Sequence, residues 1–230
     1  MDNTLQNCVF FGVFISILTY IAGDFLRKKL KWAILNPLLI SVVLVIIFLK
    51  VFNIKYDTYI SGAKYLSYLL TPATVCLAIP LYEQIDKLKK DWKAIAAGIV
   101  SGVITSLLCV FVMSLLFGLN HSEYVTLLPK SITTAIGMGV SEELGGHVTI
   151  TVAVIIVTGI LGNIIASGVC RIFKITEPVA VGIGIGTAAH AIGTTKAMEM
   201  GEIQGAMSSL SIAVSGILTV IGATVFSYFI

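Results

Sequence analysis

The chain has 230 residues, of which 57% are hydrophobic and 12% are charged, and its formal net charge is +3. Its mean hydropathy of +1.00 excludes a soluble domain and indicates an integral membrane protein. The basic residues lie in short loops and form no patch for nucleic acid, and the four cysteines show neither metal-ligand nor disulfide spacing.

Six apolar segments approach the length of about 20 residues that a helix needs to cross a bilayer. In chain order they lie at residues 8–23, 33–51, 59–82, 94–119, 149–170 and 206–230. Two further apolar segments, residues 124–146 and 178–200, are interrupted by glycine and polar residues. We therefore expect an all-α, polytopic membrane protein with about six to eight spanning or re-entrant segments, internal repeats and discontinuous helices.

The expected organisation is one integral membrane domain over residues 1–230. Two N-terminal spans occupy residues 1–58, and residues 59–230 form a core that contains the interrupted segments. Cytoplasmic loops carry an excess of lysine and arginine, and two such clusters occur, at residues 27–31 and 87–93. We expect both clusters in the cytoplasm and both termini outside. Whether the interrupted segments cross the bilayer or re-enter is left open.

A spacing of 57 residues relates parts of this core. Ala78-Ile79-Pro80 recurs as Ala135-Ile136-Gly137, and residues 99–103 recur as residues 156–160. A third copy begins at Ala191-Ile192-Gly193, 56 residues after the second. Interrupted segments in corresponding positions indicate a transporter binding site. We therefore expect repeated units, each an interrupted segment followed by a continuous span.

The first interrupted segment combines a lysine with hydroxyl and glycine residues. Lys130 offers a positive charge to a carboxylate, whose oxygens the nearby hydroxyls can hold. These hydroxyls belong to Ser131, Thr133 and Thr134. In the alternative interpretation, Lys130 extends to the membrane interface and the hydroxyls bond to their own backbone. Glu142 and Glu143 are candidates for coupling an ion, or else loop carboxylates in water.

The second interrupted segment places a histidine among glycines and threonines. Ionisable residues at membrane depth cost about 2.5–3.5 kcal/mol on insertion scales and usually face a pathway. The candidate solute contacts here are His190, Gly193, Thr194 and Thr195. His190 would orient the solute or carry a proton, because histidine titrates near neutral pH; the alternative is a structural hydrogen bond. Ser208 and Ser209 are further candidates, with helix–helix contact as the alternative.

No nucleophile and base stand out in the chain, and its three histidines show no zinc-ligand spacing. We therefore expect neither enzymatic activity nor a cofactor nor a metal. The residue pattern instead favours a carrier for a small organic anion in the lipid bilayer.

Several stretches of the second half carry a family resemblance. They lie at residues 129–134, 140–146, 158–162, 186–194 and 202–209, and the most specific reads Gly-Thr-Ala-Ala-His-Ala-Ile-Gly-Thr. On these residues the chain resembles the LrgB/CidB family of bacterial membrane proteins. Ala135 stands where many members are expected to have proline, so Gly137 and Gly139 must supply the flexibility at this break.

The resemblance implies a bacterial plasma membrane, a partner protein of the LrgA/CidA type and one of two roles. Some members are described as antiholin-like regulators of murein hydrolases and autolysis. Others look like carriers for pyruvate, glycolate or glycerate. We expect a monocarboxylate carrier, since lysis regulation explains neither His190 nor the hydroxyl-rich breaks. The antiholin-like regulator is the first alternative and a channel the second. The solute, the coupling ion and a homo-oligomer are left open.

Overall fold

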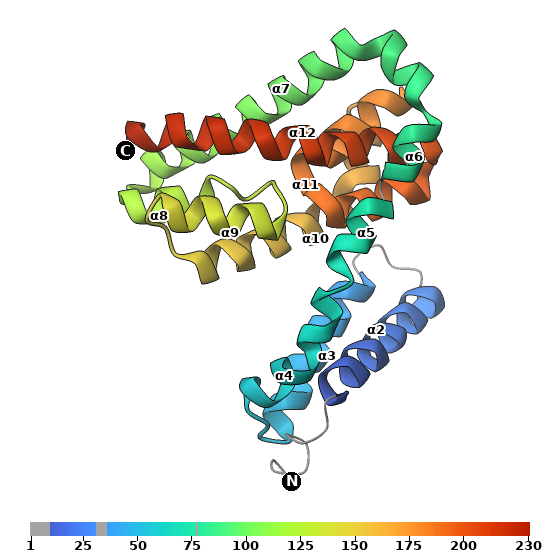
Figure 1. Ribbon diagram of the computed structural model, residues 1–230, viewed down its shortest axis with the longest axis vertical. Helices are drawn as coiled ribbons and strands as arrows, with labels where there is room; N and C mark the ends of the chain where they lie inside the picture. The colour runs from blue at the N-terminus through green and yellow to red at the C-terminus, as the bar shows by residue number, and fades with distance from the viewer. Residues whose placement is uncertain (1–9, 31–35, 77) are drawn as a thin grey trace. The chain divides into compact units, whose positions relative to one another are not determined.

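The computed structural model describes residues 10–30, 36–76 and 78–230, and Figure 1 labels its helices. Within these ranges all regular structure is helical and no strand occurs, which confirms the expected all-α class. The chain divides into two compact units, Met1–Cys76 and Leu77–Ile230. The single domain expected over residues 1–230 stays a prediction.

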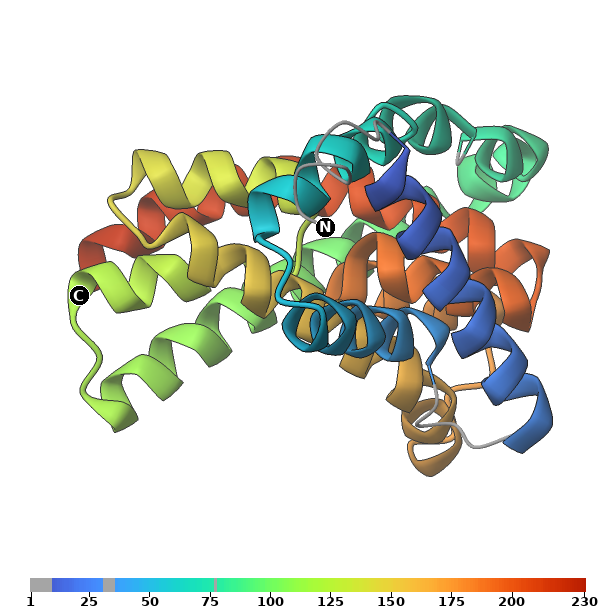
Figure 2. The ribbon, with the colours of Figure 1, turned by 90° about the horizontal axis from the view of Figure 1, so that it is seen from below.

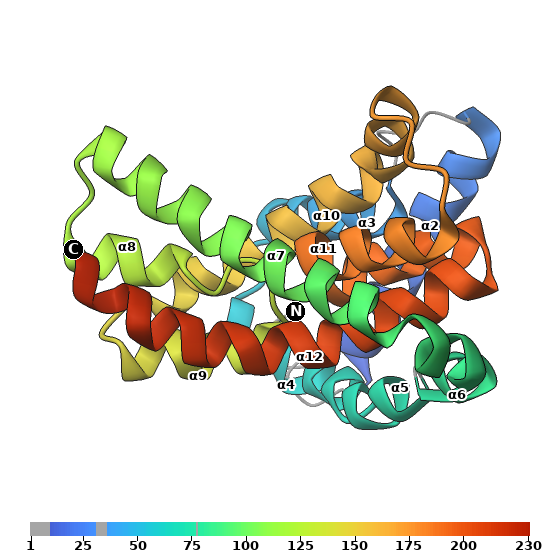
Figure 3. The ribbon, with the colours of Figure 1, turned by 90° about the horizontal axis from the view of Figure 1, so that it is seen from above.

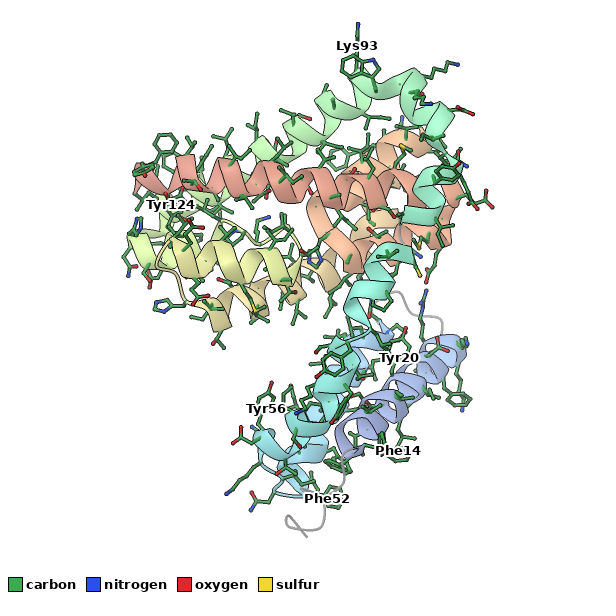
Figure 4. The ribbon with its side chains drawn as sticks, viewed as in Figure 1. Phe14, Tyr20, Phe52, Tyr56, Lys93 and Tyr124 are labelled. Carbon is green, nitrogen blue, oxygen red and sulfur yellow. The ribbon has the colours of Figure 1, made fainter. Side chains whose placement is uncertain are left out.

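The first unit packs its helices closely. Its described helices are α2 (Phe11–Leu30), α3 (Pro37–Val51), α4 (Tyr56–Ser67) and α5 (Leu70–Cys76). Gly12 lets α2 approach α4, because a Cβ at this position would meet the backbone of Tyr59 and Ala63. A hydrogen bond of 2.9 Å between the hydroxyls of Thr19 and Ser41 joins α2 to α3. Phe14 and Tyr20 are exposed on α2 (Figure 4), which suits a helix that faces lipid.

The second unit contains the long apolar helices. Its elements are α6 (Ala78–Glu83), α7 (Ile85–Phe117), α8 (His121–Leu127), α9 (Thr134–Glu143), α10 (Val148–Ile172), α11 (Pro178–Met200), α12 (Glu202–Phe226) and the 3₁₀ turn η1 (Ser227–Phe229). Among the described residues, three stretches are long and apolar enough to cross a membrane, namely Lys89–Phe117, Val148–Ile172 and Glu202–Phe229. α11 packs against α7, α10 and α12 and so lies at the centre of the unit (Figure 3).

Each copy of the predicted repeat contains a shorter helical segment followed by a long helix. In the first copy the short helix α6 precedes the long α7, and in the second α9 precedes α10. In the third copy the part of α11 after residue 190 precedes α12. The continuous span expected in each copy is one of the three stretches long enough to cross a membrane.

The expected span at residues 59–82 is not one helix. Helix α4 ends at Ser67, and α5 begins at Leu70. Pro72 lies in the first turn of α5, where proline is tolerated because the amide it lacks would have no helical partner. The break inside the expected span therefore lies just before this proline. The starts of the two preceding spans, at residues 8 and 33, lie outside the described residues.

The end of α12 is fixed against α8, as all three ribbon views show (Figures 1, 2 and 3). Tyr124 on α8 is fully buried and donates a hydrogen bond of 3.0 Å from its hydroxyl to the Phe226 carbonyl. Figure 4 shows its ring between the two elements. A hydrogen bond of 2.7 Å joins His121 Nδ1 to the Ile230 carbonyl. These contacts hold α8 in place immediately before the first break.

Candidate functional site

The first break separates α8 from α9. A capping box formed by Asn120 and Glu123 starts α8. Pro129 ends it, because a proline ring collides with the carbonyl of the preceding helical turn. The chain then makes a tight turn, in which the amide of Lys130 bonds to the Leu127 carbonyl at 3.2 Å, and α9 begins at Thr134. The turn places Lys130 and Ser131 side by side at the middle of the interrupted segment.

Lys130 is held by hydroxyl groups alone among the described side chains. Its Nζ donates to Ser131 Oγ at 2.8 Å and to Ser106 Oγ of α7 at 3.2 Å. The two serine hydroxyls lie 3.1 Å from one another. The ion pairs given by the described residues include Asp24 with Lys28 and Lys196 with Glu199, and none of them pairs Lys130 with a described carboxylate. A half-buried ammonium group without a carboxylate partner favours an anion nearby.

This cationic cluster opens into a cavity of about 790 Å³ between α7 and α11. Residues on one face of α7 form one wall, namely Gly98, Ser101, Gly102, Thr105, Ser106 and Cys109. The first half of α11 forms the other wall, with Val179, Ala180, Ile183, Gly184, Thr187 and Ala188. Asp91 and Glu177 also line the cavity. Asp91 precedes Ser106 by about 22 Å of helix, so the acidic residues lie at the end away from Lys130.

Glycines of α7 let the two walls approach one another. A Cβ at Gly98 would lie 3.3 Å from the side chain of Ile183, and one at Gly102 would lie 2.9 Å from Thr187 Oγ1. These two contacts also fix how the helices are aligned: Gly98 is level with Ile183, and Gly102 is level with Thr187. The helices therefore run in the same direction along the cavity.

The second break lies at His190 inside α11, as the sequence predicts. The residue has φ of 42° and ψ of −142°, and its ring is buried with 2% of its surface exposed. Because a carbonyl only accepts hydrogen bonds, Nε2 donates to the Ile155 carbonyl of α10 at 3.0 Å. A Cβ at Gly159 would lie 2.7 Å from this ring, and one at Gly162 would overlap Ala189. Because Gly159 and Gly162 have no side chains, α10 leaves room for the His190 ring and for Ala189 at the break.

The backbone of His190 is strained, since a positive φ favours glycine. Such residues cost about 1–3 kcal/mol each and persist only where the surroundings enforce them. Here the bond to Ile155 and the close packing on Gly159 provide that support. The ring does not line the cavity. A structural role is therefore visible for His190, and contact with a solute or a proton stays a prediction.

The hydroxyls after the second break join α11 to α12. Thr194 Oγ1 donates to the His190 carbonyl at 2.9 Å and lies 2.7 Å from Ser208 Oγ, with both side chains buried. Ser209 donates to the Gly205 carbonyl at 2.9 Å. Gly193 is buried against Ala189 and Ile185. These groups therefore already have partners within the protein.

The remaining predicted residues lie at the surface or at helix ends. Thr195 is exposed and accepts a hydrogen bond of 2.9 Å from Asn163. Thr133 and Thr134 are half-buried at the start of α9, whereas Glu142 and Glu143 are exposed at its end. None of these residues lines the cavity. In the described part of the chain, no cluster of three or more His, Cys, Asp or Glu side chains could hold a metal ion.

Of the predicted solute contacts, the structure brings Lys130 and Ser131 to the cavity and leaves the others outside it. It adds Ser106 and Thr187, which sequence reasoning missed. A signal was present on α7, where Gly98, Gly102 and Ser106 recur every fourth residue and therefore share one helix face. Within a long apolar span this pattern resembled ordinary helix packing.

Comparison with known proteins identifies relatives over nearly the full length. The model of the LrgB-like family matches residues 16–229. The chain is 38% identical over 222 residues to the antiholin-like protein LrgB of Bacillus cereus strain B4264, which covers 96% of each chain. The same identity and coverage hold for the antiholin-like protein LrgB of Bacillus anthracis strain A0248. No solved structure matches the chain.

Proposed function

The chain belongs to the LrgB-like family, and we propose that it is a carrier that moves a small monocarboxylate across the bacterial membrane. One observation carries the proposal: the ammonium group of Lys130 faces a cavity of about 790 Å³ with only hydroxyl partners among the described side chains. An LrgA/CidA-type membrane protein is the partner we propose for it.

The cluster of Lys130, Ser106 and Ser131 suits a carboxylate. A carboxylate has two oxygens that accept several hydrogen bonds, and bonds from an ammonium group are charge-assisted and therefore stronger than neutral ones. The serine oxygens accept from Lys130, and the hydroxyl hydrogens of both serines can donate to the carboxylate oxygens. A single uncompensated positive charge matches a single negative charge, which favours a monocarboxylate over a dicarboxylate.

A second candidate is an antiholin-like regulator that acts through assembly in the membrane. Its support is the name of relatives that match 96% of the chain. Assembly of helices requires packing surfaces and does not require an ammonium group at a cavity, so the Lys130 cluster favours the carrier.

Uptake into proteoliposomes tests the carrier. The purified chain, alone and with an LrgA-type partner, should take up radiolabelled pyruvate, glycolate or glycerate. The uptake should saturate and unlabelled solute should compete. Flux that rises linearly with concentration would indicate a channel instead. Absence of flux from both preparations, at measured protein incorporation, would leave the regulator as the better function.

The proposed orientation places both termini outside and the two basic clusters in the cytoplasm. In a background whose native cysteines are serine, Lys28→Cys and Lys89→Cys should react with a membrane-impermeant maleimide only after the cytoplasmic side is opened. Asn120→Cys, on the opposite side of the proposed topology, should react in intact cells. Labelling of Lys28→Cys or Lys89→Cys from outside would reverse the orientation.

A further inference from the structure

We propose that the cavity binds monocarboxylates with extended apolar tails, and that Gly184 sets the length of tail it accepts. This inference rests on the proposed function, because the tail is measured from a carboxylate held at Lys130. It adds a substrate class, straight-chain aliphatic acids longer than three carbons, and a residue that determines specificity.

The size of the cavity is the first observation. A volume of about 790 Å³ lies within the range of about 300–1,000 Å³ that encloses drug-sized ligands. A three-carbon acid would fill only the part beside Lys130. The remaining space runs along α7 and α11 toward Asp91 and Glu177, so the tail of a longer acid would occupy it.

The chemistry of this remaining space is the second observation. Its walls carry Gly98, Val179, Ala180 and Ile183, which offer no side-chain hydrogen bond. Two hydroxyls in the same region already donate to their own helices, Ser101 to the Gly98 carbonyl at 2.9 Å and Thr187 to the Ile183 carbonyl at 2.8 Å. The space therefore favours methylene groups, and no described cation in the lining could pair with a second carboxylate there.

The position of Gly184 is the third observation. It follows Ile183, which is level with Gly98, and Gly98 lies about 12 Å along α7 from Ser106. Gly184 is thus about 10 Å from the carboxylate end, beyond the reach of a short acid. A Cβ at Gly184 would meet no heavy atom within 4 Å. A larger side chain therefore has room here without displacing a neighbour, and Gly184 also lines a second, smaller cavity of about 250 Å³ against α10.

Binding of a homologous series to the purified full-length protein tests the proposal. Calorimetric titration with propionate, butyrate, hexanoate and octanoate should show affinity rising about three- to fourfold per buried methylene. Suberate, which adds a second carboxylate at the far end of the octanoate chain, should bind more weakly than octanoate. In Gly184→Leu, propionate should bind as in the unchanged protein, and octanoate should lose at least about tenfold in affinity.

Two further variants make the test specific. Ala188→Leu, one turn nearer Lys130 along α11, should move the loss of affinity to shorter acids. Gly168→Leu is the matched control, since Gly168 lies on α10 with open space around it and does not line the cavity. It should bind the whole series as the unchanged protein does.

The outcomes separate this inference from the function it rests on. Equal affinity for short and long acids would overturn the tail-binding proposal and leave the carrier intact. A rise with length that Gly184→Leu and Ala188→Leu do not change would place the tail elsewhere and also overturn it. Failure of every acid in the series to bind would overturn the inference, and it would overturn the proposed function as well only if pyruvate, glycolate and glycerate uptake were also absent with and without the partner.

Discussion

Replacing Lys130 by glutamine is expected to reduce monocarboxylate uptake by about ten- to a hundredfold. Glutamine keeps a polar end but removes the charge, and hydrogen bonds to charged groups contribute about 1.5–3 kcal/mol. Each 1.4 kcal/mol corresponds to about a tenfold change in affinity. Initial rates of pyruvate uptake into proteoliposomes, divided by the amount of incorporated protein, measure the effect.

Lys196→Gln is the matched control for this variant. Lys196 is also partly buried, but it pairs with Glu199 at 2.9 Å and lies outside the cavity. Its replacement should leave uptake within about twofold of the unchanged protein, as for a partly exposed ion pair. The proposed anion site fails if Lys130→Gln transports normally, or if both variants lose uptake equally.

Replacing Gly162 by alanine is expected to destabilise the protein by about 1–3 kcal/mol, the usual cost of inserting a methyl group into a packed interface. The new Cβ would overlap the Cβ of Ala189, and neither methyl group has a rotamer that relieves the contact. The variant should therefore melt at a lower temperature in detergent than the unchanged protein.

Gly168→Ala gives the comparison on the same helix. No heavy atom lies within 4 Å of a Cβ built there. Alanine is favoured over glycine in a helix by about 1 kcal/mol, so this variant should melt at the same or a higher temperature. Equal melting temperatures for Gly162→Ala and Gly168→Ala would show that α11 does not pack on Gly162 as described.

Local sequence was sufficient for the long helices and for the presence of an interruption in each of the two interrupted segments. The position of the first break was predicted wrongly: it lies between α8 and α9, whereas Gly137 and Gly139, which were expected to supply the flexibility, lie inside the regular helix α9. The residues of α7, α10 and α12 form nearly continuous apolar runs and were predicted as spans. The end of α4 at Ser67, inside the expected span at residues 59–82, was not predicted, because a proline in the first turn of a new helix, such as Pro72, and a proline within a span look the same in sequence.

The site could be predicted only in part, because its walls come from segments far apart in the chain. Lys130 and Ser131 stand out as polar residues at a break. Ser106 becomes their partner only when α7 packs against the turn before α9. The direction of the His190 ring depends on a backbone conformation that residue type does not give, and this conformation turns the ring toward α10.

The left-handed backbone at His190 bears on how the protein is assembled. Its strain of about 1–3 kcal/mol is offset by contacts from α10, so the break is not encoded in residues 178–200 alone. An isolated peptide of these residues lacks these contacts and is therefore not expected to keep this backbone conformation. During synthesis α10 leaves the ribosome before α11 does. The surface of α10 that contacts His190 is therefore synthesised before α11, the helix that contains the break.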